Sequence, residues 1–346
     1  MSGAASSEPG HLVSGAKRFF LKGADRALVR RMESGLDRVE RSVRTHAGSA
    51  DPVVDAVSRY LVEAGGKRVR PLLVLLTAQL GSGITDEVVA AATVVELTHV
   101  ASLYHDDVMD EADLRRGVPT AQRTWTNSIA ILAGDILFAR ASELVAPLGE
   151  RALRMQASTF ARLCEGQMRE TLGPAESDDP IEFYLQVLAD KTGSLIAAAA
   201  QYGILLSGAD EQYLAPVREY GEAIGVAFQL IDDVIDVRST QDESGKVPGT
   251  DLRDGVPTMP WLLLQRRAVD DPEARAEVER ITALLDDDAT LPDALAQLGA
   301  HTVTEETLQI AHTWADRAVA ALEPLPEGPV RAALGELADT IVSRSH

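Results

Sequence analysis

Two short acidic segments carry the residues whose types and spacing best indicate chemistry. Residues 106–110 and 232–236 both read D-D-x-x-D within runs of apolar residues. Positions i and i+4 share one face of a helix, so these carboxylates repel one another, and burying them is costly. A divalent cation relieves both costs, and Mg²⁺ is usual where phosphates complete its shell. One such segment fits a solvated helix edge equally well, but two copies favour metal binding. The candidate metal ligands are Asp106, Asp107, Asp110, Asp232, Asp233 and Asp236.

Basic and amide residues near these segments favour an anionic substrate. The segment 65–71, GGKRVRP, combines two glycines that allow close backbone approach with three cations at the start of a helix. Taken alone, it fits better as a basic loop that balances local charge. Together with two metal sites, it suits one or two substrates that carry a diphosphate. Further candidates are His99, Arg115, Arg116, Lys191, Thr192, Gln229 and Lys246.

The segments that position these residues read as helices throughout. They are long, apolar at helical spacing, and rich in Ala, Leu, Glu, Gln and Arg, while alternating stretches typical of strands are nearly absent. We therefore expect an all-α protein with a disordered tail over 1–14 and one all-helical domain over 15–346. The expected helices are about 17–46, 52–64, 69–80, 86–110, 120–146, 150–171, 181–206, 211–237, 257–267, 271–286, 292–298, 303–321 and 328–344.

Composition excludes several other classes of protein. The 346 residues carry a net charge of −20, which repels nucleic acid and anionic membranes at long range. Cys164 is the single cysteine, so an intramolecular disulfide and a cysteine zinc site are excluded. No signal peptide or membrane-spanning stretch is evident, and we expect a cytoplasmic protein. Motifs of nucleotide-binding proteins and serine hydrolases are absent from the sequence.

Five segments in a fixed order resemble the trans-isoprenyl diphosphate synthase (polyprenyl synthetase) family, in its long-chain type. They are GGKRVRP, ELTHVASLYHDDVMDEADLRRG, DKTGSLI, FQLIDDVIDV and GKVPGTDLRDG, and the resemblance is close over residues 51–260. It implies an antiparallel helical bundle around a deep central cavity, a homodimer, and three Mg²⁺ ions per active site. It also implies head-to-tail (1'-4) condensation of isopentenyl diphosphate with an allylic diphosphate, with transient membrane contact for product release.

The resemblance also implies a role for each candidate residue. Mg²⁺ on the allylic diphosphate would be held by Asp106, Asp107, Asp110 and Asp232, and more weakly by Asp233 and Asp236. That diphosphate or its ligands would be bound by Arg115, Lys191, Thr192, Gln229 and Lys246. Isopentenyl diphosphate would be held by Gly66, Lys67, Arg70, His99 and Arg116. Diphosphate leaves first, the allylic cation is attacked by the isopentenyl double bond, and the departed diphosphate takes the proton. Apolar walls exclude water from the cation.

Two positions depart from the family pattern. Val256 stands where family members commonly have a lysine, which removes one cation from the allylic diphosphate site. Gln167 stands where the family often has a glutamate that could contribute to a metal site. Long-chain members of the family resemble this sequence at the position of Val256.

Small residues before the first acidic segment predict a long product, roughly C30 to C50, as in quinone tails. Family members that stop at C15 or C20 often carry Phe or Tyr at the positions of Ala101 and Ser102, which would form the floor of the tunnel for the growing chain. A deeper floor could come from Phe138, Met155 or Phe160. The alternatives are a short-chain geranylgeranyl or farnesyl diphosphate synthase, a class I terpene cyclase, and the partner subunit of a two-component synthase.

Overall fold

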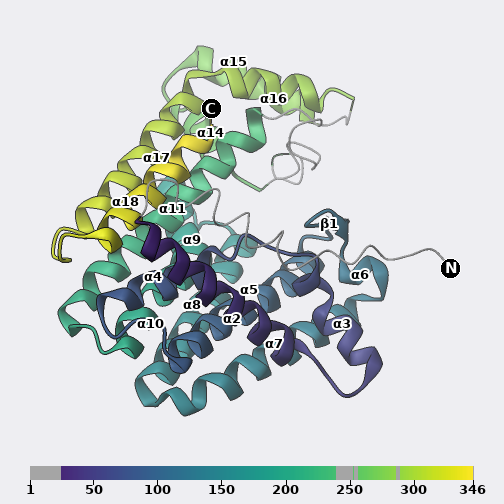
Figure 1. Cartoon of the computed structure of the whole chain (residues 1–346). Helices are drawn as coiled ribbons and strands as arrows, with labels where there is room; N and C mark the ends of the chain where they lie inside the picture. The colour runs from purple at the N-terminus through teal and green to yellow at the C-terminus, as the bar shows by residue number, and fades with distance from the viewer. Residues whose placement is uncertain (1–24, 239–251, 253–255, 286–288, 346) are drawn as a thin grey trace. The chain divides into compact units, whose positions relative to one another are not determined.

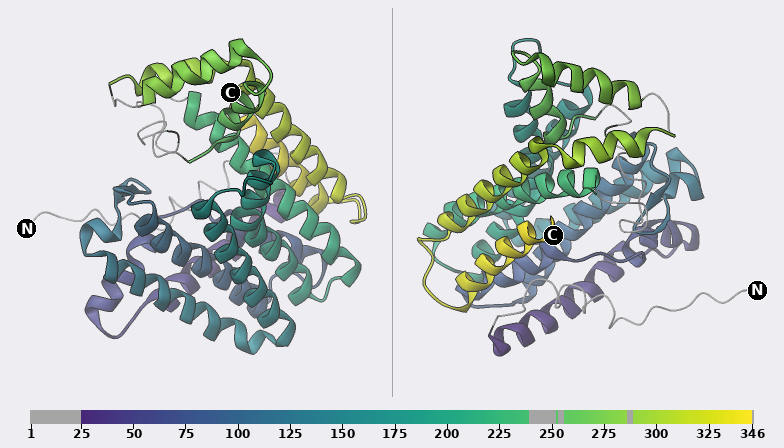
Figure 2. Two further views of the ribbon diagram at one scale, coloured as in Figure 1. Left: turned by 180° about the vertical axis from the view of Figure 1, so that it is seen from behind. Right: turned by 90° about the horizontal axis from the view of Figure 1, so that it is seen from above.

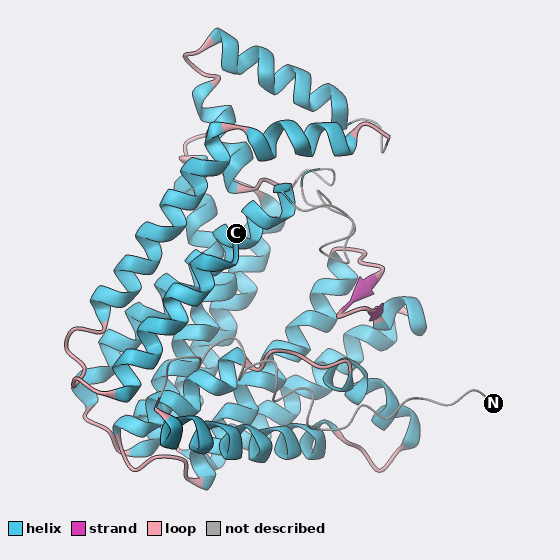
Figure 3. Cartoon of the chain, turned by 45° about the horizontal axis from the view of Figure 1, so that its top comes forward, coloured by secondary structure: helices cyan, strands magenta, loops and turns pink. Residues whose placement is uncertain are grey.

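Helix follows helix along the chain, and the predicted all-α class is confirmed. The computed structural model describes residues 25–238, 252, 256–285 and 289–345. Figures 1 and 2 show the helices from three sides, and Figure 3 shows a two-stranded hairpin as the single sheet of the described residues. The predicted tail over 1–14 lies outside these residues, and the single domain over 15–346 stays a prediction.

The chain forms two compact units. Among the described residues, unit 1 comprises 25–160, 195–221 and 321–337, and unit 2 comprises those within 161–194, 222–320 and 338–345. The elements before the division at residue 160 are α2 (Arg26–Ala47), α3 (Pro52–Glu63), α4 (Val69–Thr77), η1 (Ala78–Leu80), α5 (Asp86–Met109), β1 (Leu114–Arg115), β2 (Val118–Pro119), α6 (Ala121–Thr124), α7 (Asn127–Val145) and η2 (Ala146–Leu148).

The later elements include most of unit 2. Five helices have residues in both units. They are α8 (Glu150–Leu172), α10 (Ser194–Ser207), α11 (Leu214–Arg238), α18 (Pro329–Val342) and, by its last residue, α17 (Thr302–Ala321). The remaining elements are α9 (Pro180–Leu188), η3 (Ala189–Gly193), η4 (Glu211–Tyr213), α14 (Met259–Arg267), α15 (Pro272–Leu285), α16 (Leu291–Ala300) and η5 (Ser343–Ser345).

Local capping explains where several helices begin. The Asp25 carboxylate accepts hydrogen bonds from the first turn of α2, and Asp51 does the same for α3, where Pro52 also fits the first helical position. The hydroxyl of Thr85 caps α5 by accepting from the backbone N–H of Val88 at 3.3 Å. These short polar side chains satisfy N–H groups that a helix start leaves without intrahelical partners.

Helix α5 is the core helix of unit 1 and contacts α2, α4 and α7. It is the described helix that is long and apolar enough to cross a bilayer, but 72% of that stretch is buried within the fold, as in a core helix. Tyr104 fastens it to α3, because its hydroxyl donates to the Val57 carbonyl at 2.5 Å and accepts from the Leu61 N–H at 3.2 Å.

Three local features differ from the helices predicted from sequence. The predicted helix 120–146 is broken at Trp125, and α7 begins afresh after Thr126, whose hydroxyl caps it. The predicted helix 181–206 contains the π-helical turn η3. The hairpin was not predicted. Its two-residue turn has φ of 54° at Arg116 and 78° at Gly117, as a type I′ turn requires.

Candidate functional site

The first acidic motif (residues 106–110) ends α5, and its middle carboxylate is anchored. Asp107 is 2% exposed, and its Oδ1 accepts a hydrogen bond from Arg115 Nε at 2.6 Å. Gln122 donates to the Asp107 backbone carbonyl at 2.7 Å, which ties the helix end to α6. Asp106 is half-buried and Asp110, the C-cap of α5, is exposed. The motif therefore presents its outer carboxylates while the central one is held in place.

A group of basic residues in unit 1 forms what we call the cationic site. Its members are Lys67, Arg70, His99 and Arg116. Burial lowers the pKa of Arg70 to about 10, with Glu96 opposing the shift and Arg116 adding to it, so Arg70 stays charged at neutral pH. Its Nε is buried without a hydrogen-bond partner among the described residues, which leaves a donor for a ligand. Lys67 is exposed on the adjoining loop.

His99 is neutral within this basic environment. Burial, followed by the charges of Arg70 and Arg116, holds the pKa of His99 well below its usual range. A neutral imidazole has one donor and one acceptor nitrogen, so His99 can hydrogen-bond a diphosphate oxygen without adding charge.

Two consecutive arginines connect the first acidic motif to the loop before α4. Arg115 holds Asp107, while Arg116 Nη1 donates to the Leu61 carbonyl at 2.7 Å and, in a short contact, to the Gly65 carbonyl. A Cβ at Gly66 would lie 2.8 Å from Arg68 Nη1 and 3.1 Å from Arg116 Nη2, and its φ is 153°. The backbone conformation therefore favours glycine there, and a Cβ would also displace the guanidinium of Arg68.

The predicted chain-length residues lie along α5, α7 and α8. Ala101 is fully buried, and the Ser102 hydroxyl donates to the His99 carbonyl at 2.9 Å. Among the deeper candidates, the Phe138 ring lies 5.5 Å from that of His105, which precedes the first acidic motif, and 4.4 Å from that of Phe160. Met155 is half-buried on α8.

In unit 2, Lys191 and Thr192 lie on the π-helical turn η3. A π turn widens a helix locally and is frequent at functional sites. Lys191 Nζ forms a short ion pair with Glu170 of α8. Helix α11 packs closely against this turn at Gly225. A Cβ at Gly225 would lie 2.5 Å from Gly193 Cα, so only glycine allows the two backbones to come this close. The contact fixes η3 against the helix that carries the second acidic motif (residues 232–236).

Asp190 anchors the same turn and was missed by the sequence analysis. It is 4% exposed, and its carboxylate accepts hydrogen bonds at 2.9 Å each from Arg162, Arg169 and Gln186. Arg162 also donates to Glu222 of α11 at 2.5 Å. The network therefore links α8, η3 and α11 around the residue that precedes Lys191.

The second acidic motif contains residues with different surroundings. Asp233 is 7% exposed, and its Oδ2 accepts from the Tyr184 hydroxyl at 2.8 Å and from the Met259 N–H at 3.0 Å. This carboxylate thereby caps α14. The Asp232 side chain is 41% exposed, with Arg344 at 3.8 Å. Asp236 and Gln229 are half-buried on α11. Asp232 is thus better placed than Asp233 to reach a ligand.

The donor set suits Mg²⁺ that is shared with a substrate. Within the described ranges, no three His, Cys, Asp or Glu side chains converge to hold a metal on their own. Mg²⁺ usually keeps waters and binds through one or two carboxylates together with substrate phosphates. In unit 1, the carboxylates of Asp106 and Asp110 fit that mode, and in unit 2 the carboxylate of Asp232 does so by itself.

Some predicted positions add little or lie outside the structure. Lys246 is outside the described residues. Val256 is 36% exposed. The Oε1 atom of Gln167 is buried without a hydrogen-bond partner among the described residues. Of the residues that sequence reasoning missed, Glu96 gave the clearest signal, because a carboxylate between Val95 and Leu97 in an apolar helix requires a buried partner.

Comparisons with known proteins identify the family. The polyprenyl synthetase family model matches residues 51–298. A Mycobacterium tuberculosis protein named nonaprenyl diphosphate synthase is 45% identical over 325 residues, which cover 92% of this chain and 95% of that protein.

Solved structures agree with this match. A polyprenyl synthase from Caulobacter crescentus CB15, complexed with calcium and isoprenyl diphosphate, has a TM-score of 0.83 at 34% identity, covering 94% of this chain and 100% of that one. A geranylgeranyl pyrophosphate synthase from Corynebacterium glutamicum, with the same ligands, has a TM-score of 0.81 at 40% identity, covering 94% and 99%. The chain therefore belongs to the polyprenyl synthetase family, and the predicted isoprenoid synthase fold and prenyltransferase class are confirmed.

The Asp190 network yields a stability prediction. Asp190→Ala removes the buried carboxylate that accepts hydrogen bonds from Arg162, Arg169 and Gln186, and we expect a loss of about 2 kcal/mol in the free energy of unfolding, measured with urea. Glu176→Ala, an exposed change in the preceding loop, is the matched control and should stay within about 0.5 kcal/mol of the wild type. Equal stability of the two variants would contradict an anchoring role.

Proposed function

We propose that this member of the polyprenyl synthetase family is a Mg²⁺-dependent synthase of long trans-polyprenyl diphosphates. It condenses isopentenyl diphosphate head-to-tail (1'-4) with an allylic diphosphate, and its product is about C30 to C50. The relative named nonaprenyl diphosphate synthase supports a product in this range. Calcium and isoprenyl diphosphate in two structural relatives support divalent metal and diphosphate as ligands.

The connection made by Arg115 and Arg116 carries this proposal. It joins the acidic helix end and the cationic site within unit 1, so both are positioned before any ligand binds. One scaffold can then hold one diphosphate through metal-bridged carboxylates and the other through direct cation contacts.

Each residue then has a defined task. Lys67, Arg70 and Arg116 hold isopentenyl diphosphate, while neutral His99 donates a hydrogen bond and Gly66 lets the backbone approach. Lys191 exchanges Glu170 for the allylic diphosphate, assisted by Thr192, Gln229 and Lys246, with Arg115 orienting Asp107. Bound Mg²⁺, up to three ions, would be held by Asp106, Asp107, Asp110, Asp232 and Asp236 and would neutralise charge on the leaving oxygens.

Asp233 fits a supporting role better than direct metal binding, because its Oδ2 already receives two hydrogen bonds. We place it as the residue that holds the second acidic motif against α9 and α14. Loss of its capping bond would affect the position of Asp232 one residue earlier.

Alternative functions differ in their products. The likeness to a geranylgeranyl pyrophosphate synthase is the observation that supports the first alternative, a short-chain synthase. A class I cyclase would consume the allylic diphosphate alone, and the partner subunit of a two-component synthase would need a second protein. The presence of both acidic motifs together with GGKRVRP favours an independent synthase.

We further propose that the protein acts as a cytoplasmic homodimer that touches membranes transiently to release its product. Large apolar side chains are exposed on α7 at Ile131 and Leu132 and on α8 at Leu153 and Phe160. The two helices meet at the Phe138–Phe160 ring contact. Exposed apolar surface of this kind marks interfaces, and a second copy is its proposed occupant.

Removal of the outer carboxylates tests the metal assignment. Asp106→Ala and Asp232→Ala should each lower incorporation of labelled isopentenyl diphosphate by at least about a hundredfold, because charge on the leaving group loses its stabilisation. Both residues are partly exposed, so thermal unfolding should change little. Glu143→Ala, which removes an exposed carboxylate of α7, should keep wild-type activity. Wild-type rates in both aspartate variants would refute the assignment.

Substitution at the tunnel floor tests the chain-length assignment. Ala101→Phe should shorten the product, because the larger side chain fills space beneath the first acidic motif. Ala101 is fully buried, so the variant should also lose about 1–3 kcal/mol of stability from overpacking. Ala320→Phe adds the same side chain at an exposed position of α17 and should leave product length unchanged. A folded Ala101→Phe enzyme with the wild-type product would exclude Ala101 from the floor.

A further inference from the structure

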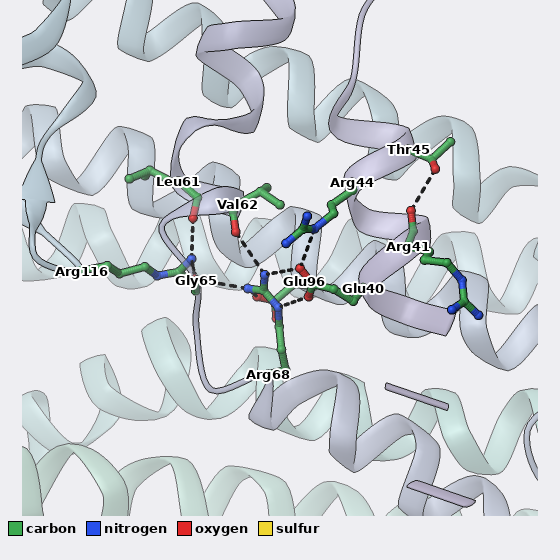
Figure 4. Close-up of polar contacts among 10 residues, drawn as sticks. All are labelled: Glu40, Arg41, Arg44, Thr45, Leu61, Val62, Gly65, Arg68, Glu96 and Arg116. Atoms are coloured by element: carbon green, nitrogen blue, oxygen red, sulfur yellow. Dashed lines mark hydrogen bonds and ion pairs between the residues drawn. The ribbon is translucent and has the colours of Figure 1, made fainter. Parts of the chain in front are cut away.

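Arg68 lies at the centre of a buried ion network in unit 1 (Figure 4). Its side chain is 6% exposed, and those of its two partners, Glu40 of α2 and Glu96 of α5, are 10% and 3% exposed. Arg68 Nε donates to Glu40 Oε2 at 2.9 Å, and Nη1 donates to Glu96 Oε1 at 2.7 Å. We refer to these three residues as the Arg68 network.

The guanidinium has no donor left for a substrate. Besides the two bonds above, Nη1 donates to the Gly65 carbonyl at 3.4 Å, and Nη2 donates to Glu40 Oε1 at 3.4 Å and to the Val62 carbonyl at 3.2 Å. An arginine has five N–H groups, and all five of Arg68 have an acceptor within the protein. Arg68 therefore differs in kind from Arg70, although both belong to the same basic segment.

The network also holds an unfavourable backbone conformation. Arg68 has φ of 51°, in the left-handed region, and it directly precedes α4 without capping it through its side chain. A non-glycine residue pays roughly 1–2 kcal/mol in that region, so surrounding interactions must compensate. The bonds to Val62 and Gly65 close the loop on itself, and those to Glu40 and Glu96 fasten it to two helices.

Glu96 extends the network to the cationic site. Its charge favours the protonated forms of Arg70 and Arg116 and opposes the lowering of their pKa by burial. Burial also opposes the charge of Arg68, but Glu96 and Glu40 outweigh it and raise the pKa of Arg68. Because the Arg68 guanidinium is fully hydrogen-bonded to groups of the protein, we assign ligand binding to the other cations of this region, Lys67, Arg70 and Arg116.

We propose that Arg68 is a positioning residue for the isopentenyl diphosphate site. The Arg68 network holds the loop from Gly65 to Arg68 in one conformation. This fixes the backbone that carries Lys67 and leads to Arg70, and it offers the Gly65 carbonyl to Arg116. Lysine cannot replace Arg68, because an ammonium has three donors and lacks the planar fork that joins two carboxylates and two carbonyls. This inference rests on the proposed function, since it assigns the ligand of the cationic site.

Arg68→Lys provides the test, with Arg44→Lys as a matched control. Arg44 also pairs with Glu40, at 3.1 Å, but it lies on the outer side of α2 with its side chain 33% exposed. In Arg68→Lys, we expect KM for isopentenyl diphosphate to rise at least about tenfold, or 1.4 kcal/mol of binding. KM for the allylic diphosphate should be unchanged. Arg44→Lys should match the wild type in both.

Direct binding separates this inference from the proposed function. Calorimetric titration with isopentenyl diphosphate should show the same tenfold loss in Arg68→Lys, whether or not the enzyme turns over. If Arg68→Lys does not fold, Glu40→Gln serves instead, because it keeps the shape but weakens the network, and it should raise the same KM selectively. An unchanged isopentenyl KM, or equal rises for both substrates, would overturn the positioning role. Isopentenyl binding without incorporation by the wild type would contradict the proposed function alone.

Discussion

An arginine whose donors are all satisfied internally sets the geometry on which the cationic site depends. Because Glu40 comes from α2 and Glu96 from α5, the shape of the loop at Arg68 is determined by helix packing rather than by the loop itself. The Gly65 carbonyl of the same loop accepts a hydrogen bond from Arg116, which lies in the hairpin that follows the first acidic motif. Charged groups that are held before ligand binding need no reorganisation during the reaction, which is the most effective arrangement for stabilising developing charge.

In unit 2, a buried carboxylate that binds arginines likewise fixes the position of a neighbouring cation. The buried Asp190 carboxylate takes up arginine donors from α8, and the residue that follows it, Lys191, is thereby positioned on a widened turn. The glycine contact between η3 and α11 adds a steric constraint, since a Cβ at Gly225 would lie 2.5 Å from Gly193 Cα. In both units, buried carboxylates thus hold arginines in place, and the backbone fixed in this way carries the cations that we assign to diphosphate binding.

Sequence reasoning predicted what depends on local spacing. The acidic motifs, the GGKRVRP loop and most helix boundaries follow from periodicity, capping residues and glycine placement. The family resemblance left Arg68 out of the ligand-binding set, but local spacing gave no physical reason for it. The difference from Arg70 lies in partners of Arg68 that are 28 residues away in both directions. The capping of α14 by Asp233, the break at Trp125 and the π turn likewise arise from tertiary packing, which overrides helical propensity.

The most direct test of this account is the product distribution of the purified enzyme with Mg²⁺, labelled isopentenyl diphosphate, and geranyl, farnesyl or geranylgeranyl diphosphate as separate primers. Dephosphorylated products would be sized by reversed-phase chromatography. We expect successive elongation from a primer to a ladder that ends at C30 or beyond. A ladder that stops at C20 would contradict the long-chain assignment while keeping the family chemistry. Failure to incorporate isopentenyl diphosphate with every primer would contradict the account of an independent synthase.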